Sequence, residues 1–237
     1  MMNRMLHIVV PVVIALVAGG NGADAAETVP ATVTDVDRNV YHTVIIGTQT
    51  WMVENLKTTR LNDGGAMALV TQSAAWAKLE TPGYCWYLNE DSTSNKTAGA
   101  LYNWYAVNTG KLAPAGWHVA TEEEWGLLVA FLGGPDGAGG KLKAAGLSLW
   151  KEPNVAATNS TGFSALPGGL RDLEGVFTDS GLAGPMWTAT EYDITISKYF
   201  NVKYDSAEIN RGGMRKKCGL SVRCVKNPSA GGATNKR

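Results

Sequence analysis

The stretch GWHVATEEEW, from Gly116 to Trp125, carries the clearest structural signal in this chain of 237 residues. Thr121 can cap the start of a helix, and Glu124 can reach back to the amide of the cap, which is the capping-box pattern. An apolar stripe at helical spacing follows, and a glycine pair ends it: Trp125, Leu128, Phe131 and Leu132, then Gly133 and Gly134. We predict a helix that begins after Thr121, and we interpret the three glutamates as its cap rather than as a metal or acid–base site.

On both sides of this stretch, other blocks combine a large anchor residue with glycine, proline or a capping residue. They read IGTQTWMVENL (46–56), ALYNWYAV (100–107), FSALPGGLRD (163–172), MWTATE (186–191) and GLSVRCVK (219–226). The chain has 28 glycines and 8 tryptophans, and its glycine content is well above the ~7% of an average protein. Because glycine-rich chains spend much of their length in turns, we expect irregular backbone held in place by buried tryptophans.

Short elements are predicted between these anchors. Residues 44–52 predict a hairpin that turns at Gly47 and Thr48. Residues 71–79 predict a short helix around Trp76, residues 84–87 an aromatic strand, and residues 100–107 one face of a helix. The second half is predicted to be rich in strands, at 186–190, 198–204, 208–210 and 220–225. In the last strand, Leu220, Val222 and Cys224 are expected to point inward, opposite to Ser221, Arg223 and Val225.

The two ends of the chain differ from its body. Arg4, the apolar run at 8–18 and the tripeptide Ala23-Asp24-Ala25 form the pattern of a cleaved secretory signal peptide. An N-terminal membrane anchor is the alternative, although the run is short for one. No cysteine lies at the cleavage site, so we expect no lipid anchor. We predict a signal peptide at 1–25, a flexible segment at 26–32, one domain at 33–226 and a disordered tail at 227–237.

The charge balance limits the classes of partner. The chain has 21 basic and 21 acidic residues, and 20 of each remain once Arg4 and Asp24 leave with the signal peptide. This balance argues against nucleic acid or an anionic membrane as a partner. We predict a protein that is secreted or held at the cell surface, with no membrane insertion after cleavage.

The cysteine count allows one intramolecular disulfide in an exported chain. Cys85, Cys218 and Cys224 permit three pairings. A bond from Cys85 to either of the other two would close a long loop, which the loop-closure model values at about 4–5 kcal/mol. The alternative is three buried free thiols.

No constellation of catalytic or metal-ligating residues stands out. Asp35, Asp37 and Asn39 have calcium-like spacing, but the glycine and downstream glutamate of a calcium loop are missing, so a plain turn is favoured. A nucleophile needs a base and an orienting group within reach. Apart from His7 in the signal peptide, only His42 and His118 are present. We predict no catalytic residue, no metal and no cofactor.

A binding role fits the composition better than catalysis. Aromatic side chains offer sugars an apolar face and a polar edge. Glu191 with Asp193 can line a polar cleft, and Arg171 can pair with Asp172 or bond to loop backbone. Any of the aromatic candidates can instead belong to the core. The candidate ligand contacts are Tyr84, Trp86, Tyr87, Trp187, Glu191 and Tyr192.

Six blocks, in this order, resemble the Fibrobacter succinogenes major paralogous domain family. They are WMVENLKTTRLNDG (51–64), LYNWYAVNTGKL (101–112), GWHVATEEEW (116–125), GGKLK (139–143), FSALPGGLRD (163–172) and GLSVRCVK (219–226). The resemblance covers about 33–226. The family occurs in secreted and surface proteins of fibre-degrading and gut-type bacteria, and its members have no established biochemical activity. The resemblance therefore implies a location outside the cytoplasm and does not imply a mechanism.

The chain departs from the family pattern at three positions. The family commonly has glycine where Arg38 stands, proline where Ala120 stands, and often cysteine where Ala113 stands. The missing cysteine would be the usual partner of Cys224. Its absence makes a bond from Cys85 to Cys218 or Cys224 the pairing that the resemblance favours.

A weaker likeness links two blocks to the formylglycine-generating enzyme group. Ala120–Trp125 is similar to the helix start of that group, and Gly219–Cys224 is similar to its closing strand. The likeness implies an α+β, C-type-lectin-like single domain, loop-rich, in which two main helices flank short twisted antiparallel strands. Those enzymes use a cysteine pair with copper, so a cysteine-dependent oxidoreductase is one alternative function.

The function that we expect is binding outside the cytoplasm. The chain is predicted to be a non-enzymatic surface or secreted module that contacts a glycan, such as a polysaccharide, or a cell-envelope protein. A structural module for protein–protein contacts is the first alternative, and the oxidoreductase is the second.

Overall fold

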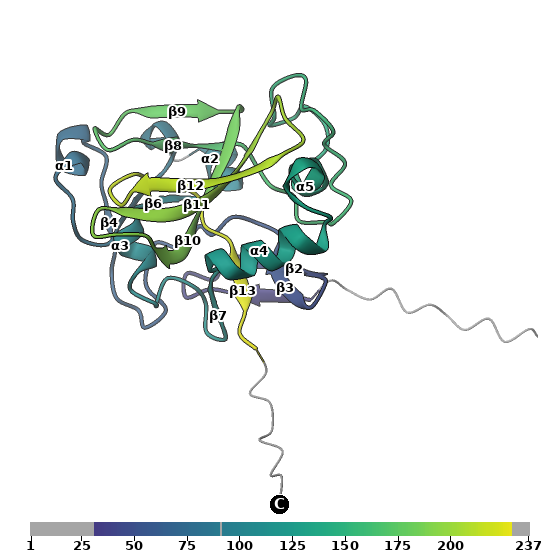
Figure 1. Cartoon of the computed structure of the whole chain (residues 1–237). Helices are drawn as coiled ribbons and strands as arrows, with labels where there is room; N and C mark the ends of the chain where they lie inside the picture. The colour runs from purple at the N-terminus through teal and green to yellow at the C-terminus, as the bar shows by residue number, and fades with distance from the viewer. Residues whose placement is uncertain (1–30, 91, 229–237) are drawn as a thin grey trace, which may run out of the picture.

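An antiparallel sheet built from both ends of the domain forms one side of the molecule (Figure 1). The computed structural model describes residues 31–90 and 92–228. Across the sheet, the strands are β1 (Thr32–Thr34), β2 (Val40–Ile46), β3 (Gln49–Met52), β13 (Cys224–Lys226) and β7 (Trp117–Val119). Because β13 lies between β3 and β7, the C-terminal block completes a sheet that the N-terminal hairpin begins.

The other strands form three smaller sheets. The largest has the order β10 (Ala183–Glu191), β11 (Ile196–Lys203) and β12 (Ile209–Arg215). The second consists of β4 (Ala68–Leu69), β5 (Gly83–Cys85) and β6 (Leu101–Tyr102), and the third of β8 (Gly168–Arg171) and β9 (Phe177–Ser180). All strand pairs that the structure describes are antiparallel except β4 with β5.

Helices are few and short, so the fold is a mixed one with mostly strands. They are α1 (Ser73–Ala77), the 3-10 helix η1 (Tyr87–Asn89), α2 (Thr93–Ala98), α3 (Trp104–Val107), α4 (Glu122–Phe131) and α5 (Pro135–Leu142). Within the described ranges, α4 and α5 are the longest, and they lie together on one side of the molecule (Figure 1). The predicted mixture of strands and helices is confirmed at this level.

The capping box at Thr121 is confirmed. The Thr121 hydroxyl accepts a hydrogen bond from the Glu124 amide at 3.2 Å, and a Glu124 carboxylate oxygen accepts one from the Thr121 amide at 2.9 Å. Of the predicted stripe, Trp125, Leu128 and Leu132 are buried. Phe131 was expected in the core but is 65% exposed, because its ring lies outside the core against the turn at Gly47.

Three other local predictions meet different outcomes. The hairpin at 44–52 is confirmed, with Gly47 in the left-handed conformation at φ +62°. The single helix over 100–107 is wrong, because Tyr102 donates its amide to the Leu220 carbonyl at 2.9 Å, which leaves only Trp104–Val107 helical. The strand at 84–87 ends at Cys85, and η1 follows it.

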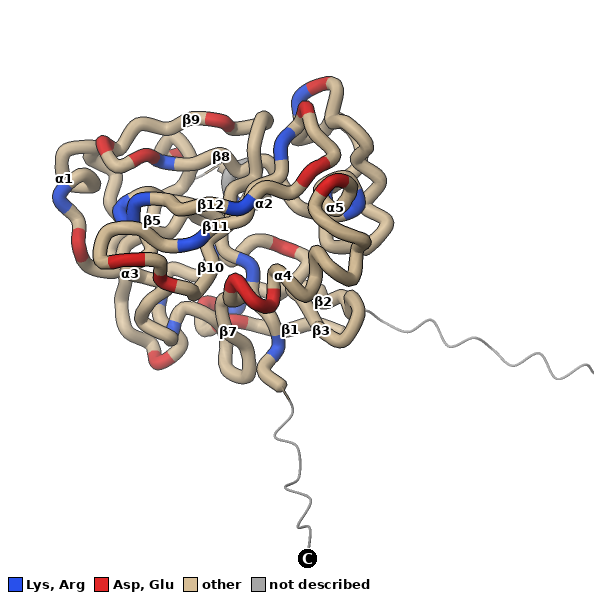
Figure 2. Tube along the Cα trace, in the orientation of Figure 1, with Lys and Arg blue, Asp and Glu red and all other residues tan. Residues whose placement is uncertain are grey.

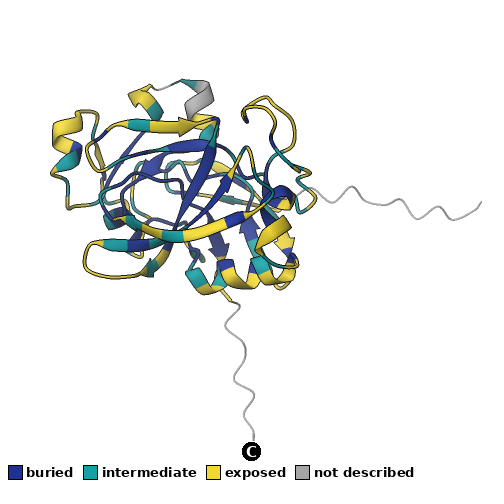
Figure 3. Cartoon of the chain, turned by 45° about the horizontal axis from the view of Figure 1, so that its top comes forward, coloured by how far each residue is buried: buried dark blue, intermediate teal, exposed yellow. Residues whose placement is uncertain are grey.

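Tryptophan burial is confirmed. Seven of the eight tryptophans are buried, and Trp117 is partly buried. The core forms two large clusters and a small third one. Neighbouring residues of a single strand enter different large clusters: on β10, Met186 enters one and Trp187 the other. The two clusters therefore share their strands, and buried positions run through the middle of the molecule (Figure 3).

The predicted strand at 220–225 is only partly formed, because β13 begins at Cys224, whereas Leu220 and Ser221 form isolated bridges. Both faces of this segment are buried. Leu220, Val222 and Cys224 lie in one cluster, as predicted. The expectation that the opposite face is less buried is wrong, because Ser221, Arg223 and Val225 are buried as well. Arg223 tolerates burial because it donates to Asn55 Oδ1 (2.6 Å) and to three backbone carbonyls, those of Met52, Phe163 and Ser164.

Buried cations recur at loop junctions of the fold. Four of them each donate to one or more backbone carbonyl groups and are covered by an aromatic ring, an arrangement that we call a cation cage. The ring lies 4.4–5.5 Å from the charged group, within the range of a cation–π contact. The cages are Lys143 with Trp150, Arg171 with Trp76, Lys216 with Trp104, and Arg223 with Phe163.

Candidate ligand-binding site

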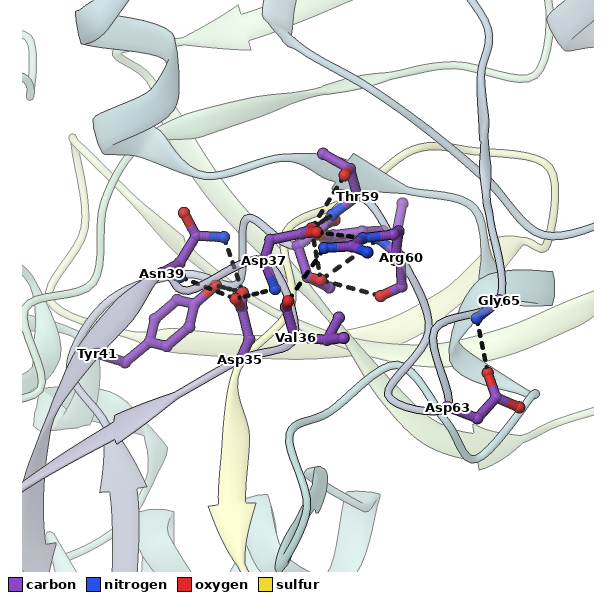
Figure 4. A network of polar contacts seen from close by, with 11 residues as sticks. Asp35, Val36, Asp37, Asn39, Tyr41, Thr59, Arg60, Asp63 and Gly65 are labelled. Atoms are coloured by element: carbon purple, nitrogen blue, oxygen red, sulfur yellow. Dashed lines mark hydrogen bonds and ion pairs between the residues drawn. The ribbon is translucent and has the colours of Figure 1, made fainter.

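The aspartates of the N-terminal turn are engaged by protein donors (Figure 4). Asp35 accepts hydrogen bonds from the amides of Asp37 and Asn39 at 2.9 Å and from the Tyr41 hydroxyl at 2.6 Å. Arg38, where the resembled family has glycine, adopts the left-handed conformation at φ +67°. The oxygens that a calcium ion would need are therefore occupied, which supports a structural turn.

Asp37 ties this turn to the segment that follows β3. Its carboxylate accepts hydrogen bonds from both the amide and the hydroxyl of Thr59, from the Thr58 hydroxyl and from Arg60 Nε at 2.6 Å. Burial opposes ionisation, but these hydrogen bonds outweigh it and lower the pKa of Asp37 to about 2. In the ranges 31–90 and 92–228, no group of three or more His, Cys, Asp or Glu side chains is arranged to hold a metal ion.

Most of the predicted ligand-contacting rings lie inside the protein. Tyr84, Trp86 and Trp187 are buried, and Trp187 donates its indole N–H to the Tyr102 carbonyl at 2.8 Å. Tyr87 is partly buried, and its ring contacts Phe177 with the centroids 5.3 Å apart. Burial leaves these rings little surface for a ligand, although Trp86 also borders a hollow of about 340 Å³ beside the N-terminal turn.

The other two predicted contacts, Glu191 and Tyr192, lie at the exposed tip of the β10–β11 hairpin. Tyr192 is 62% exposed, and Lys198 Nζ lies 4.3 Å from its ring centroid. Glu191 forms an ion pair with the buried Lys216. Asp193 caps the turn by accepting the amides of Thr195 and Ile196, at 2.6 and 2.8 Å.

The expected disulfide is not formed. Cys85, Cys218 and Cys224 are all buried and free, which corresponds to the alternative of three buried thiols. Cys85 packs in the small core cluster with Trp76, whereas Cys218 and Cys224 belong to a different cluster. This separation explains why Cys85 does not pair with either of them. Burial raises the pKa of Cys85 and of Cys218 to about 12 and raises that of Cys224 further, so the thiols stay protonated.

The two described histidines have structural partners. His42 Nδ1 pairs with Glu54 at 2.6 Å. His118 lies between Glu124, which its Nε2 contacts at 2.7 Å, and Asn227, which its Nδ1 contacts at 2.7 Å. Arg171 does not pair with Asp172 but donates to the carbonyls of Val70, Thr71 and Gly175. These contacts join loops and do not assemble a nucleophile with a base.

A hollow of about 350 Å³ lies on one face of the β10–β11–β12 sheet. Tyr199, Asn201 and Lys203 of β11 point into it, because alternate residues of a strand share a face. The intervening residues Phe200 and Val202 are buried in the core on the opposite face. The rest of the lining comes from neighbouring elements: Leu170, Asp179, Leu182, Ala183, Pro185, Tyr204, Asp205 and Met214.

The polar groups of this hollow have spare hydrogen-bonding capacity. Asn201 is only 8% exposed, and its buried side-chain oxygen Oδ1 has no hydrogen-bond partner within the part of the chain that the structure describes. A buried acceptor without a partner costs about 1–3 kcal/mol. Asp179 and Asp205 are exposed at the rim, and neither forms an ion pair with a described residue. The hollow thus combines two tyrosines, two carboxylates, the Lys203 side chain and one unpaired amide oxygen.

Sequence reasoning missed this site, although a signal was present. The predicted strand at 198–204 alternates the polar Tyr199, Asn201 and Lys203 with the apolar Phe200 and Val202. Such alternation identifies the face away from the core. It does not reveal that the β8–β9 hairpin and the loop after β11 would wall that face into a hollow.

Comparison with known proteins agrees with the order of blocks along the chain. A family model described as the Fibrobacter succinogenes major domain matches residues 44–226, which is more than half of the chain. No curated protein and no solved structure matches it. The matched range begins in β2 and ends at the last residue of β13, so it includes the hollow, the cation cages and the capping box. The chain belongs to the Fibrobacter succinogenes major domain family.

Proposed function

We propose that this chain is an exported, non-enzymatic module that binds a glycan in the hollow on the β10–β11–β12 sheet. The observation that carries the proposal is the buried Oδ1 of Asn201, which has no partner among the described residues and belongs to a hollow that two tyrosines also line. A sugar hydroxyl can donate a hydrogen bond to such an oxygen. Binding of a hydroxyl there would remove the cost of leaving the oxygen without a partner.

The remaining lining suits a neutral sugar. The carboxylates of Asp179 and Asp205 can accept hydrogen bonds from hydroxyl groups at the rim. The rings of Tyr199 and Tyr204 can contact the C–H face of a pyranose. A hollow of about 350 Å³ lies within the size range of small-molecule sites and would hold one or two sugar units of a chain.

The proposal includes a location outside the cytoplasm. The signal-peptide pattern at 1–25 lies outside the described residues, and it supports secretion or display at the cell surface. Within the described ranges, no helix has the length and apolarity that a membrane crossing requires. We further propose a C-type-lectin-like arrangement, which is supported by the pairing of the C-terminal strand β13 with β3 near the start of the domain.

A protein–protein module is the second candidate, and exposed apolar residues favour it. Leu127 and Phe131 of α4 line a separate hollow beside the β2–β3 turn and are 56% and 65% exposed. The oxidoreductase alternative has less support. Its cysteines, Cys218 and Cys224, are buried with raised pKa values, and neither lines the hollow on β11.

The test is binding of the full chain to an array of neutral oligosaccharides, followed by titration of the best hit. We expect retention of at least one sugar chain. Asp179→Asn and Asp205→Asn keep the shape of the rim but weaken hydrogen bonding to hydroxyl groups, so each should reduce affinity about three- to tenfold.

Glu123→Gln is the matched control, because Glu123 is an exposed acid on α4, a helix outside the hollow. It should leave the affinity unchanged. If no sugar is retained, or if the rim variants and the control behave alike, the hollow is not a glycan site.

A further inference from the structure

A second hollow, of about 710 Å³, lies where β12 ends beside α1. It shares no lining residue with the hollow on β11. Three consecutive basic residues form part of its wall, and Figure 2 shows basic positions at this end of β12. Its lining consists of Ala77, Glu80, Tyr105, Leu173, Ile194, Thr195, Arg215, Lys216 and Lys217.

Lys216 is a buried charge in the wall of this hollow. Its side chain is only 6% exposed, and Nζ lies 4.7 Å from the centroid of the Trp104 ring. Nζ also donates to the Ile194 carbonyl at 3.1 Å. Its ion-pair partner is Glu191, whose side chain is 56% exposed. A fixed, buried ammonium is therefore covered by a carboxylate that is largely in solvent.

The two neighbouring cations, Arg215 and Lys217, have different partners. Arg215 is exposed and donates to the Thr195 hydroxyl at 3.0 Å, and among the described residues no carboxylate pairs with it. Lys217 pairs with the exposed Glu80 at 2.9 Å. Arginine presents a planar fork of donors that fits a carboxylate in a bidentate manner. Arg215 therefore has donors left for a carboxylate at the rim.

The other walls are apolar and open to solvent. Ile194 is 89% exposed at the tip of the β10–β11 hairpin, and Leu173 is 38% exposed. Tyr105, which is partly buried, also lines the hollow. Exposed isoleucine and leucine beside a cationic group match a protein segment better than a sugar, because they offer apolar side chains a contact that polyhydroxylated rings do not need.

We propose that this hollow binds an acidic protein segment, in which an Asp or Glu carboxylate engages Arg215 and Lys216 while an adjacent apolar side chain packs on Ile194 and Leu173. In the free protein, Glu191 occupies the position at Lys216 that the incoming carboxylate takes. Glu191 is then an internal competitor, and its displacement is part of binding. The inference does not depend on the glycan site.

The probe is the acetylated, amidated tripeptide leucyl-aspartyl-leucine, and the neutral control has asparagine in place of aspartate. Each is titrated into the full chain while backbone amide signals are followed by NMR. We expect the acidic peptide to shift the signals of residues 191–196 and 215–217, and the neutral peptide to leave them in place. Added salt should weaken binding, because part of the attraction is between charges near solvent.

Two exposed positions give opposite expected effects. Arg215→Gln removes the free guanidinium and should weaken binding about tenfold. Glu191→Gln removes the competing charge and should strengthen it about threefold. Arg211→Gln is the matched control, because Arg211 is an exposed arginine on the same strand outside the hollow.

The proposal requires that Glu191→Gln raise the affinity for the acidic peptide and that Arg215→Gln lower it. If Glu191→Gln fails to strengthen binding, or if Arg215→Gln and Arg211→Gln weaken it equally, the carboxylate does not bind where we place it. Equal shifts with both peptides would also overturn the proposal. So would binding of an oligogalacturonate, which carries carboxylates on sugar rings, in preference to the acidic peptide.

Discussion

Three of the four caged cations lack a carboxylate partner among the described residues. Lys143 Nζ donates to the carbonyls of Val155, Lys203 and Ser206, each at 2.8 Å. Arg171 and Arg223 likewise direct their donors mainly at backbone carbonyls. An irregular loop leaves carbonyl groups without a ladder partner, and a buried cation can satisfy several of them at once. These side chains thus satisfy the carbonyl groups of loops, as backbone hydrogen bonds satisfy those of strands.

His118 gives a prediction for the pH dependence of stability. Its hydrogen bond to Glu124 raises the pKa of His118 above 6.5. The pKa of Glu124 is lowered, because hydrogen bonds from His118 and Thr121 outweigh burial. The histidine contributes stability in full below its unfolded pKa and loses it as pH rises through the folded value. The glutamate contributes above its unfolded pKa and loses it as pH falls through the folded one.

The contribution of the pair is therefore largest between about pH 5 and 6. We expect His118→Gln to lower the free energy of unfolding by about 0.5–1 kcal/mol at about pH 5.5 and by less at about pH 8.5. Urea unfolding of both proteins at the two pH values measures the difference. An equal or larger loss at the higher pH would contradict the assignment.

At the scale of elements, α5 depends on close approach between its glycines and two loops. A Cβ on Gly139 would lie 2.1 Å from the Glu208 carbonyl oxygen, whereas a Cβ on Gly137, in the same helix, would meet nothing within 4 Å. We expect Gly139→Ala to cost about 1–3 kcal/mol through overpacking. Gly137→Ala should stabilise the protein by about 0.5–1 kcal/mol through helix propensity.

Thermal or chemical unfolding of these two alanine variants checks the contrast. Both substitutions are the same chemical change in one short helix, so helix propensity cancels in the comparison. Similar stabilities for the two variants would mean that the packing of α5 against the loop at 207–208 is not tight.

Elements specified by local hydrogen bonding could be predicted from the sequence. The cap at Thr121 and the turn at Gly47 each depend on residues within a few positions, and both are present. The segment 100–107 could not be predicted, because Tyr102 pairs with Leu220, more than a hundred residues away, and the Ala100 amide donates to the Leu56 carbonyl. Regular periodicity does not carry that information.

The candidate site was hard to predict for a related reason. Aromatic residues were expected to contact a ligand, yet Trp86 and Trp187 were needed as anchors of the core. The residues that line the hollow on β11 come from five strands, β8 to β12, and from two loops, and only the fold brings them together. Burial of a polar group such as Asn201 is likewise a tertiary property, and residue type does not reveal it.

At the scale of the whole molecule, the two large core clusters share strands β3, β10 and β13. Trp51 and Met52 of β3 enter different clusters, as do Cys224 and Val225 of β13. We therefore expect the domain to unfold as one unit. We infer that buried tryptophans and cation cages hold this loop-rich chain as one rigid body, on which the hollows are already formed.

Arg223 offers the most direct test of that claim. Arg223→Met replaces the guanidinium with an apolar side chain of similar length. The change leaves Asn55 and three backbone carbonyls without their hydrogen-bond donor. The measurement is guanidinium unfolding followed by both tryptophan fluorescence and far-UV circular dichroism, with Arg211→Met, a change of an exposed arginine, as the control.

We expect one coincident transition in the wild-type protein. The free energy of unfolding should fall by about 3 kcal/mol or more in Arg223→Met and by less than about 0.5 kcal/mol in the control. Two separate transitions in the wild-type protein, or an Arg223→Met variant as stable as the control, would contradict this inference.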